Sequence, residues 1–286
     1  MLIKKGHPMK KIHFLLFLIS TFSSTLLPQS LLLTPDNTAF ALDIDGVILT
    51  LPKSQWPFIV YKSAELIQSA QDAQDLSKTL WYMSGMKGMR DEDGNKIDGL
   101  TAQMITLGMQ HKEATRFIAP MLDIIEDARQ LDQEMVKIIK DAHLPTIYAT
   151  NKDILTYQRA VNKHNLKHLA IQAIVTKHPL SPKVLEYAQL SDTPESYRLL
   201  VNEYHNAQET DNIKIASDKK PSLKYYELVE KVIGCEKNII HPDDTKKNTD
   251  AFNTLNSDSA QRIGVHYQGN PEQLKDLLTE LGLRTS

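Results

Sequence analysis

Apolar residues occur in two patterns along the chain, and the two patterns predict different elements. Short runs rich in Ala, Ile and Val predict buried strands. These runs cover residues 38–49, 145–151, 169–175, 238–241 and 261–267, with a shorter extended run at 213–216. Longer stretches, in which apolar residues recur at helical spacing, predict helices. They cover residues 62–80, 101–111, 114–142 with an interruption near Pro120, 153–165, 223–233 and 271–283.

Strands that alternate with helices predict an α/β fold, in which a Rossmann-like parallel sheet core is flanked by helices. The long helical region between the first two strands predicts a second, mainly helical unit at residues 52–130, so that the core takes residues 38–51 and 131–286. Residues 178–212 are polar and contain three prolines, which predicts an insertion within the core. Two interpretations of this insertion stay open, a contact surface for a protein partner and an inert surface excursion.

The composition is that of an ordinary globular protein. Of the 286 residues, 41% are apolar and 24% are charged, and the formal net charge is −2. Without a basic excess, we expect no nucleic-acid partner. Cys235 is the single cysteine, so neither an intramolecular disulfide nor a zinc site built on cysteines can form.

The first 30 residues have the pattern of a signal peptide. Lysines at positions 4, 5, 10 and 11 precede an apolar stretch that runs to Leu27. We therefore expect residues 1–30 to direct the protein to a secreted or periplasmic location. An uncleaved N-terminal anchor is the alternative, and only in that case do we expect an association with a membrane.

Polar side chains stand where the predicted strands end or the following helices begin. Asp43 and Asp45 end the first strand, and alternation along an extended chain places both on the same side. Further along the chain, the equivalent positions hold Thr150 with Asn151, Lys219 with Lys220, and Asp243 with Asp244 and the later Asn248. Because the carboxyl ends of parallel strands meet at one edge of the sheet, these residues are predicted to line one crevice.

These residue types suit phosphoryl transfer. A carboxylate can attack phosphorus and form an aspartyl phosphate, and a second acid can protonate the leaving oxygen and later activate water. A hydroxyl can hold the phosphoryl oxygens, and a lysine can offset the charge that accumulates in the transition state. Further acids can hold Mg²⁺, which prefers oxygen ligands.

The four motifs together resemble those of the haloacid dehalogenase superfamily of hydrolases. The first motif of that family, DxD followed by glycine and a β-branched residue, matches residues 43–47. Its second motif, an apolar strand that ends in Ser or Thr, matches 148–151, and its Lys-Pro motif matches 220–221. Its Asp-Asp motif with a later Asn matches 243–248, and the order and spacing agree from about residue 38 to residue 269.

The resemblance implies a role for each matched residue. Asp43 would be the nucleophile, and Asp45 would be the general acid and base. Thr150 and Asn151 would bind the phosphoryl group of the substrate. Lys220 would orient both Asp43 and that phosphoryl group.

The same resemblance implies a Mg²⁺ site and a helical cap. The metal ligands would be Asp43, Asp45 through its backbone carbonyl, Asp243 and Asp244, with Asn248 in support. The helical unit at 52–130 would be a cap inserted after the first motif, which closes over small substrates. Its candidates for substrate contact are Trp81, Met83, Lys87 and Arg90.

Two departures from the family pattern bear on the structure. Lys219 stands beside Lys220 and is an alternative for the lysine role, although the position of Pro221 favours Lys220. Pro242 stands where the family has an apolar strand residue. Since proline has no N–H for the strand ladder, we expect the strand to end one residue earlier.

The resemblance implies a Mg²⁺-dependent phosphatase that hydrolyses a small phosphomonoester through an aspartyl-phosphate intermediate. Asp45 favours phosphate esters over halides, because a leaving oxygen needs a proton and a leaving halide does not. A phosphotransferase or phosphomutase of the same fold is one alternative. A secreted effector that acts on a protein partner through residues 178–212 is another.

Overall fold

The computed structural model describes residues 33–84, 89–91, 93–255 and 260–283. The predicted signal peptide at residues 1–30 lies outside the described residues, and so does Lys87. Within the described part of the chain, no helix has the length and apolar content that a membrane span needs.

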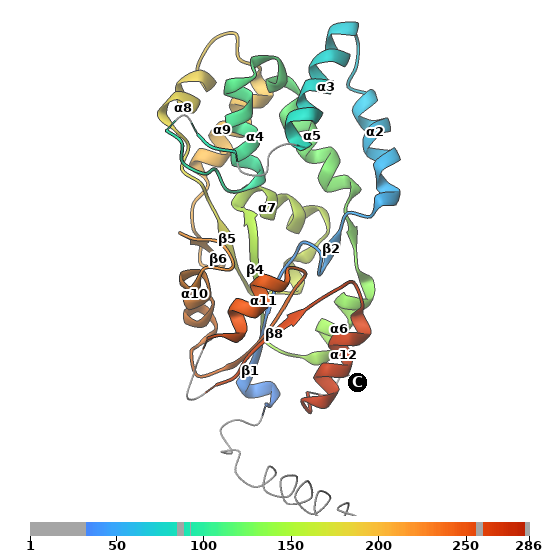
Figure 1. Ribbon diagram of the computed structural model, residues 1–286, viewed down its shortest axis with the longest axis vertical. Coiled ribbons are helices and arrows are strands. Elements are labelled where there is room, and N and C mark those ends of the chain that lie inside the picture. The colour runs from blue at the N-terminus through green and yellow to red at the C-terminus, as the bar shows by residue number, and fades with distance from the viewer. Residues whose placement is uncertain (1–32, 85–88, 92, 256–259, 284–286) are drawn as a thin grey trace, which may run out of the picture.

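A six-stranded parallel sheet forms the centre of the molecule (Figure 1). Its strand order is β6-β5-β4-β1-β7-β8, and every neighbouring pair is parallel. The strands are β1 (Thr38–Leu42), β4 (Thr146–Asp153), β5 (Gln172–Thr176), β6 (Ile213–Ala216), β7 (Asn238–Asp243) and β8 (Arg262–His266). The prediction of a Rossmann-like parallel sheet flanked by helices is confirmed.

Helices of two groups surround this sheet. The helices of the core are α6 (Gln133–Ala142), α7 (Ile154–Lys163), α10 (Leu223–Ile233), α11 (Lys246–Asn253) and α12 (Pro271–Glu280). The helices of the second group are α2 (Trp56–Ala64), α3 (Ala70–Ser84), α4 (Leu100–Gln110), α5 (Thr115–Ala128), α8 (Pro182–Ala188) and α9 (Glu195–Asn206). Short 3-10 turns lie at Pro35–Asn37, Lys53–Gln55, Lys112–Ala114 and Leu166–His168.

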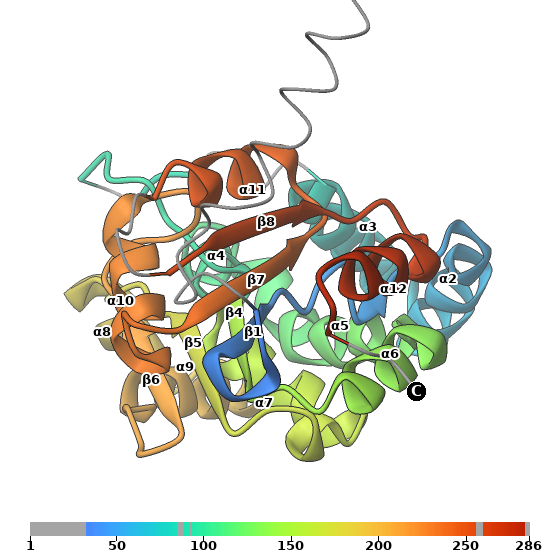
Figure 2. The same ribbon diagram turned by 90° about the horizontal axis from the view of Figure 1, so that it is seen from below.

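The two faces of the sheet bury separate apolar clusters, as alternation along each strand requires. On one face, Ala41, Ala149 and Ile239 pack against α10 and α11. On the other face, Leu42, Tyr148 and neighbouring side chains pack against α6, α7 and α12. Figure 2 shows the two sets of helices on opposite sides of the sheet. This three-layer arrangement leaves the carboxyl ends of the strands free to carry a site.

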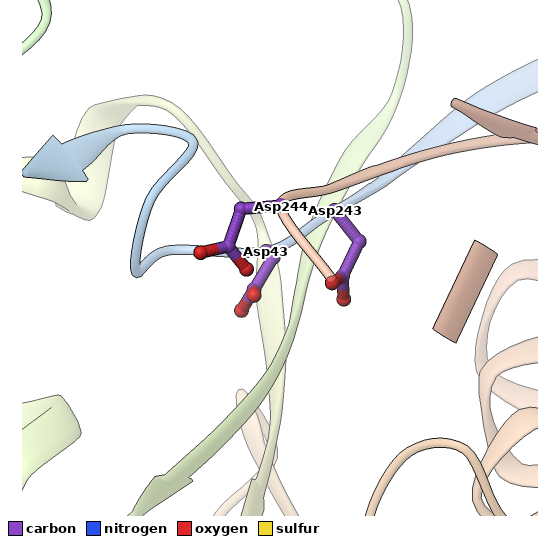
Figure 3. A group of neighbouring side chains, drawn as sticks. All are labelled: Asp43, Asp243 and Asp244. Carbon is purple, nitrogen blue, oxygen red and sulfur yellow. The ribbon is translucent and has the colours of Figure 1, made fainter. Parts of the chain in front are cut away.

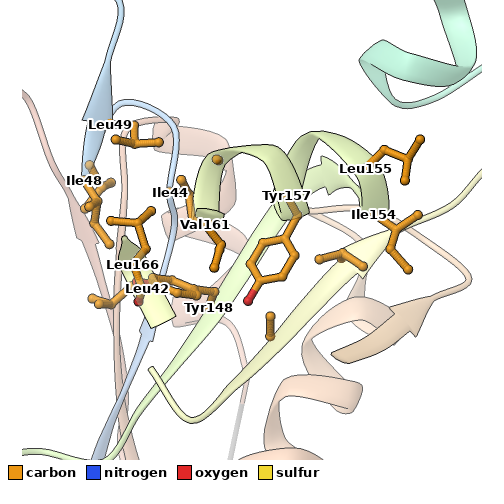
Figure 4. Packing of buried hydrophobic residues seen from close by; sticks show 14 of the residues in the cluster. Leu42, Ile44, Ile48, Leu49, Tyr148, Ile154, Leu155, Tyr157, Val161 and Leu166 are labelled. Atoms are coloured by element: carbon orange, nitrogen blue, oxygen red, sulfur yellow. Dashed lines mark hydrogen bonds between the residues drawn. The ribbon is translucent and has the colours of Figure 1, made fainter. Parts of the chain in front are cut away.

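The packing of α7 on the sheet shows how the site is supported from below (Figure 4). The ring of Tyr148 on β4 meets the ring of Tyr157 on α7 edge to face, with 6.2 Å between centroids. The hydroxyl of Tyr148 donates to the carbonyl of Leu166 at 2.9 Å, so the buried polar group has a partner. Apolar side chains of the segment after β1, Ile44 and Ile48, belong to the same cluster and fix the chain directly beyond Asp43.

The second group of helices forms a layer over the carboxyl edge of the sheet, drawn in the upper half of Figure 1. Helices α8 and α9, from the predicted insertion at 178–212, belong to this layer and pack against α4 and α5. Tyr197 on α9 is fully buried, donates to the carbonyl of Ile105, and lies so close to Gly108 that any β-carbon there would clash with its ring. The segment 178–212 is therefore part of the helical layer and not an excursion on the surface.

Two predicted elements have different bounds in the structure. The strand predicted at 38–49 ends at Leu42, the chain turns at Gly46 with a positive φ of 75°, and Leu49–Thr50 (β2) pairs antiparallel with Gln130–Leu131 (β3). The helix predicted at 62–80 is two helices, because two bonds cap the start of α3. The hydroxyl of Ser69 accepts from the amide of Asp72, and the carboxylate of Asp72 accepts from the amide of Gln68.

Pro120 lies inside α5 and does not interrupt the helix. Buried residues of α5 stand on both sides of the proline, among them Phe117, Ile118, Met121 and Leu122. Burial of this continuous apolar face outweighs the loss of one backbone hydrogen bond.

The expectation that Pro242 ends its strand is also wrong, since β7 continues to Asp243. The carbonyl of Pro242 accepts from the amide of Asp43 at 3.1 Å, so the residue keeps one of its ladder bonds. In the parallel ladder the missing N–H would serve the carbonyl of Ala41. The imidazole Nδ1 of His241 takes this place, 2.5 Å from that oxygen. A buried histidine thus compensates for the proline and keeps β7 beside β1.

Candidate active site

A cavity of about 250 Å³ lies at the carboxyl edge of the sheet, between β1, β4 and the helical layer. Six of the sequence-predicted site residues line it, namely Asp43, Asp45, Thr150, Asn151, Asp244 and Asn248. Leu100 and Leu122 close the cavity from the helical layer. The structure therefore brings together residues that lie more than 200 positions apart in the sequence.

Three carboxylates lie close together at the cavity (Figure 3). Asp43 and Asp244 line it, whereas Asp243 is fully buried. Asp43 follows β1, Asp243 ends β7, and Asp244 comes directly after it. One carboxylate oxygen from each of the three lies within 4.8 Å of the others. We refer to Asp43, Asp243 and Asp244 as the acidic floor.

Lys220 connects two members of the acidic floor from below. Its ammonium lies 3.1 Å from the nearer oxygen of Asp43 and 2.5 Å from an oxygen of Asp243, and its side chain has no exposed surface. Lys219 points elsewhere and pairs with Asp98. Of the two adjacent lysines, Lys220 is therefore the one that serves the floor.

The side chain of Asn151 binds the backbone of Lys220, and the backbone of Thr150 is bound by a tyrosine. The side-chain oxygen of Asn151 accepts from the amide of Lys220 at 2.8 Å, and its nitrogen lies 3.4 Å from the carbonyl of the same residue. The carbonyl of Thr150 accepts from the hydroxyl of Tyr225 at 3.1 Å. Thr150 is 1% exposed, so its position in the cavity wall is fixed by packing.

Asp243 is held by more donors than the other two carboxylates. Its Oδ1 accepts from the amide of Thr245 at 2.8 Å, and the side-chain nitrogen of Asn248 lies 3.0 and 3.1 Å from its two oxygens. Together with Lys220, these donors occupy both oxygens. In the described part of the chain, the contacts of Asp43 and Asp244 go to Oδ1 alone, which leaves Oδ2 of each for another partner.

Gly46 allows the first motif to approach Asp244. A β-carbon at this position would lie 2.2 Å from Oδ2 of Asp244, and the backbone has a positive φ of 75°. Both conditions require glycine. The glycine after DxD thus lets the turn pass directly beside the acidic floor.

The three carboxylates of the acidic floor differ in how their pKa is shifted. Burial raises the pKa of Asp43 to about 7, against the opposing effect of Lys220 and with a contribution from Asp243. Burial alone would also raise the pKa of Asp243, but the imidazole of His241 and the ammonium of Lys220 outweigh it and hold that pKa below its usual range. Burial and the charge of Asp243 raise the pKa of Asp244. An added cation would therefore stabilise the ionised forms of Asp43 and Asp244.

Asp45 is not a member of the acidic floor, although its charge contributes to the raised pKa of Asp43 and of Asp244. Its Oδ1 pairs with the guanidinium of Arg129 and with the ammonium of Lys152, which is 3.1 Å away. Burial would raise the pKa of Asp45, but these two cations outweigh burial and hold it below its usual range. The side chain is 44% exposed toward the cavity. Its carboxylate is not part of the group that could hold a metal ion.

The cations that hold Asp45 line the same cavity, together with a third cation. Arg129 follows α5, Lys152 lies on β4, and Arg159 on α7 completes the set. We refer to Arg129, Lys152 and Arg159 as the basic wall. Glu126 is its second counterion, 3.3 Å from Nε of Arg129 and 3.8 Å from the ammonium of Lys152.

Sequence reasoning missed the whole basic wall. Lys152 could have been found, because it directly follows Thr150 and Asn151 at the same strand end. Of the cap residues nominated instead, Trp81 and Arg90 do not line the cavity, and the side chains of Met83 and Lys87 lie outside what the structure describes. Arg90 donates to the carbonyl of Gly94 in its own turn, and the side chain of Trp81 is 70% exposed.

The acidic floor fits a magnesium ion by the chemistry of its donors. Mg²⁺ takes oxygen ligands and is usually held by one or two carboxylates with waters and substrate phosphate oxygens. Asp43 and Asp244 offer carboxylate oxygens that are not committed to protein donors. Asp243, already saturated by donors, would hold the site in shape and would not be the main ligand.

Comparisons with known proteins add little to this geometry. No family model and no curated protein matches the chain. The chain is similar to a solved structure described as "Crystal Structure analysis of a Dehalogenase", with a TM-score of 0.39 and 13% sequence identity over 88% of this chain and 99% of that chain. A likeness this weak identifies no shared function.

Proposed function

We propose that this protein is a Mg²⁺-dependent phosphatase of the haloacid dehalogenase type, which hydrolyses a small phosphomonoester through a phosphorylated Asp43. The observation that supports it most is the buried Lys220, which touches both Asp43 and Asp243 in a carboxylate group of which only Asp244 is exposed. A lone acidic cluster is common on protein surfaces. A buried ammonium between two carboxylates of neighbouring strand ends costs desolvation and is typical of a functional site.

In the first step, a carboxylate oxygen of Asp43 attacks the phosphorus of the substrate. The bond from phosphorus to the ester oxygen breaks, and that oxygen takes a proton from Asp45. For this step Asp45 must be protonated and released from its ion pairs with Arg129 and Lys152. Lys220 keeps Asp43 oriented and offsets part of the negative charge. A bound Mg²⁺ would neutralise phosphoryl charge beside Asp43 and Asp244.

In the second step, a water molecule attacks the phosphorus of the aspartyl phosphate. Asp45, now ionised, takes the proton of the water, and phosphate leaves while the carboxylate of Asp43 is restored. The ion pairs with Arg129 and Lys152 favour the ionised form of Asp45, which this step needs.

The dimensions of the cavity favour a small substrate. A volume of about 250 Å³ lies below the range of ~300–1,000 Å³ of pockets for drug-sized ligands. The helical layer covers the site through Leu100 and Leu122. We also propose that the enzyme acts outside the cytoplasm, which rests on the sequence of residues 1–30 and is tested by the N-terminus of the protein recovered from the producing cell.

Hydrolysis of p-nitrophenyl phosphate tests the proposed function. We expect turnover with Mg²⁺, no turnover with excess EDTA, and a loss of at least about a thousandfold in Asp43→Asn, as for a removed nucleophile. Asp250→Asn is a matched control, because Asp250 pairs with Lys246 on the exposed side of α11. Full activity in EDTA or in Asp43→Asn contradicts the proposal. Phosphate transferred to an added alcohol in preference to water identifies a phosphotransferase instead.

A further inference from the structure

The basic wall carries more positive charge than the proposed hydrolysis requires. Hydrolysis needs Asp43, Asp45, a phosphoryl site and a metal site, and the residues proposed for these lie on or shortly after the core strands β1, β4 and β7. Arg129 reaches the cavity from the end of α5 in the helical layer, and its side chain is only 14% exposed. Lys152 is buried as well, with 3% of its side chain exposed. Hydrolysis alone does not explain why two buried cations lie beside the reacting carboxylate of Asp45.

Asp45 is the replaceable partner of these cations. Glu126, the other counterion, is 8% exposed, and its second carboxylate oxygen lies 3.2 Å from His164. Asp45 is 44% exposed and faces the cavity. For its proposed role, its carboxyl must turn toward the ester oxygen beside Asp43. When it does so, Arg129 and Lys152 are left with one carboxylate between them, and an uncompensated buried charge is costly.

A third cation strengthens the positive side of the cavity. Arg159 on α7 lines the same cavity, and its Nη1 is buried without a hydrogen-bond partner among the described residues. Its other nitrogens lie 3.3 and 3.4 Å from Asp123 and Glu203, which hold the guanidinium in place. The cavity therefore has an acidic floor for a cation and a basic wall for an anion.

We propose that the substrate is a phosphomonoester whose alcohol portion carries a second anionic group, a carboxylate or a further phosphate, and that Arg129 and Lys152 bind this group in place of Asp45. The inference rests on the proposed function and names the substrate class for it. The anion takes the contacts that Asp45 gives up, so binding of the correct ester both fills the wall and frees Asp45 to reach the leaving oxygen. When an ester without the second anion binds and Asp45 turns away, no anion replaces Asp45 beside Arg129 and Lys152.

Two esters that differ in one charge test the inference on the wild-type protein with Mg²⁺. The charged ester is 4-(carboxymethyl)phenyl phosphate, and its uncharged match is the corresponding carboxamide, which has nearly the same size and leaving group. We expect kcat/KM to be at least about tenfold higher for the charged ester, as for one charge-assisted contact. Values for the two esters within about twofold of each other overturn the inference and leave the phosphatase proposal standing. Hydrolysis of neither ester overturns both.

Substitutions separate binding of the anion from mere positioning of Asp45. In Arg129→Met we expect turnover of both esters to fall, because Arg129 also pairs with Asp45, and the preference for the charged ester to fall at least about fivefold in addition. Arg129→Lys should retain most of the preference. An equal loss for both esters in Arg129→Met shows that the arginine only positions Asp45 and overturns the inference. Arg116→Gln is the matched control, because Arg116 pairs with Asp72 and Asp75 away from the cavity.

A product-inhibition measurement avoids any variant that fails to fold. The wild-type protein should be inhibited at least about tenfold more strongly by 4-hydroxyphenylacetate than by 4-hydroxyphenylacetamide. Equal inhibition by the two phenols contradicts a wall that binds the carboxylate.

Discussion

The acidic floor and the basic wall lie at one cavity, but they are built in different ways. The floor stands on adjacent strands β1 and β7, and its carboxylates share Lys220 and a dense set of backbone and amide donors. The wall combines α5, β4 and α7, and its members meet through long side chains and two counterions. The floor is rigid because the sheet fixes it, whereas the wall depends on how the helical layer sits over the core.

This difference assigns two separate tasks to one site. A floor that is fixed by the core can act on the phosphoryl group of any ester that enters. The basic wall, to which the helical layer contributes Arg129, contacts the remainder of the substrate and decides which ester binds. Substitutions in the acidic floor should therefore lower the turnover of all esters alike. Substitutions in the basic wall should change the ratio of kcat/KM between one ester and another.

Removal of Lys220 should give the largest effect. Lys220→Met leaves two buried carboxylates without their shared cation, so we expect turnover of every ester to fall at least about a hundredfold. The free energy of unfolding should fall by about 3 kcal/mol, as for a buried ion pair that loses one partner. Urea unfolding and steady-state rates measure the two effects. Lys219→Met is the control, since Lys219 pairs with Asp98 outside the floor, and equal behaviour of the two variants would contradict the role of Lys220.

The affinity of the floor for Mg²⁺ should depend strongly on pH. Because burial raises the pKa of Asp43 to about 7, a proton competes with the cation below that pH. The dissociation constant for Mg²⁺ should rise about tenfold for each pH unit below 7, so that it is about 30-fold weaker at pH 5.5 than at pH 8, and it should be level above 7. Isothermal titration calorimetry measures it. In Asp43→Asn this dependence should be much weaker, and an unchanged profile in the variant would place the titrating group elsewhere.

A smaller effect should follow a change at Gly46. Gly46→Ala forces a β-carbon into contact with Asp244, so we expect Mg²⁺ affinity to fall about tenfold while the wall and its ester preference are unaffected. Gly94→Ala is a matched control, because Gly94 also has a positive φ, of 81°, but has no heavy atom within 4 Å of the added carbon. If both variants bind Mg²⁺ like the wild type, Gly46 does not shape the floor.

The smallest effect should come from the wall. Glu126→Gln removes the buried counterion of Arg129 and Lys152, and the wall becomes more positive. The preference for the carboxylated ester over its carboxamide should rise about two- to threefold, with little change in Mg²⁺ affinity. A change in Mg²⁺ affinity as large as that in the ester ratio would mean that floor and wall are not separate.

The sequence predicted the floor better than the wall for a physical reason. The carboxyl ends of parallel strands share one edge, so apolar runs followed by Asp43, Thr150 and Asp243 suffice to bring these residues together. Arg129 ends an amphipathic helix, and nothing in its neighbours indicates which way that helix crosses the sheet. Tertiary packing, which the periodicity of one helix does not encode, places it over Asp45.

The element bounds predicted from the sequence were wrong where contacts distant in the sequence outweigh a local preference. Pro242 was expected to end its strand, but the imidazole of His241 supplies the missing donor. The segment at 178–212 has the composition of a loop, yet the buried face of α9 joins it to the helical layer. The break between α2 and α3 had a local signal, since Ser69 and Asp72 have the spacing of a capping box.

Chemical trapping of the phosphorylated enzyme tests the central proposal most directly. Wild-type protein is mixed with a phosphomonoester and Mg²⁺, quenched in acid within one turnover, and reduced with borohydride, which converts an aspartyl phosphate to homoserine. We predict homoserine at position 43 in the peptide map, and none in Asp43→Asn. Phosphate release at full rate with Asp43 unmodified, or with the phosphoryl group on another residue, would contradict the proposal.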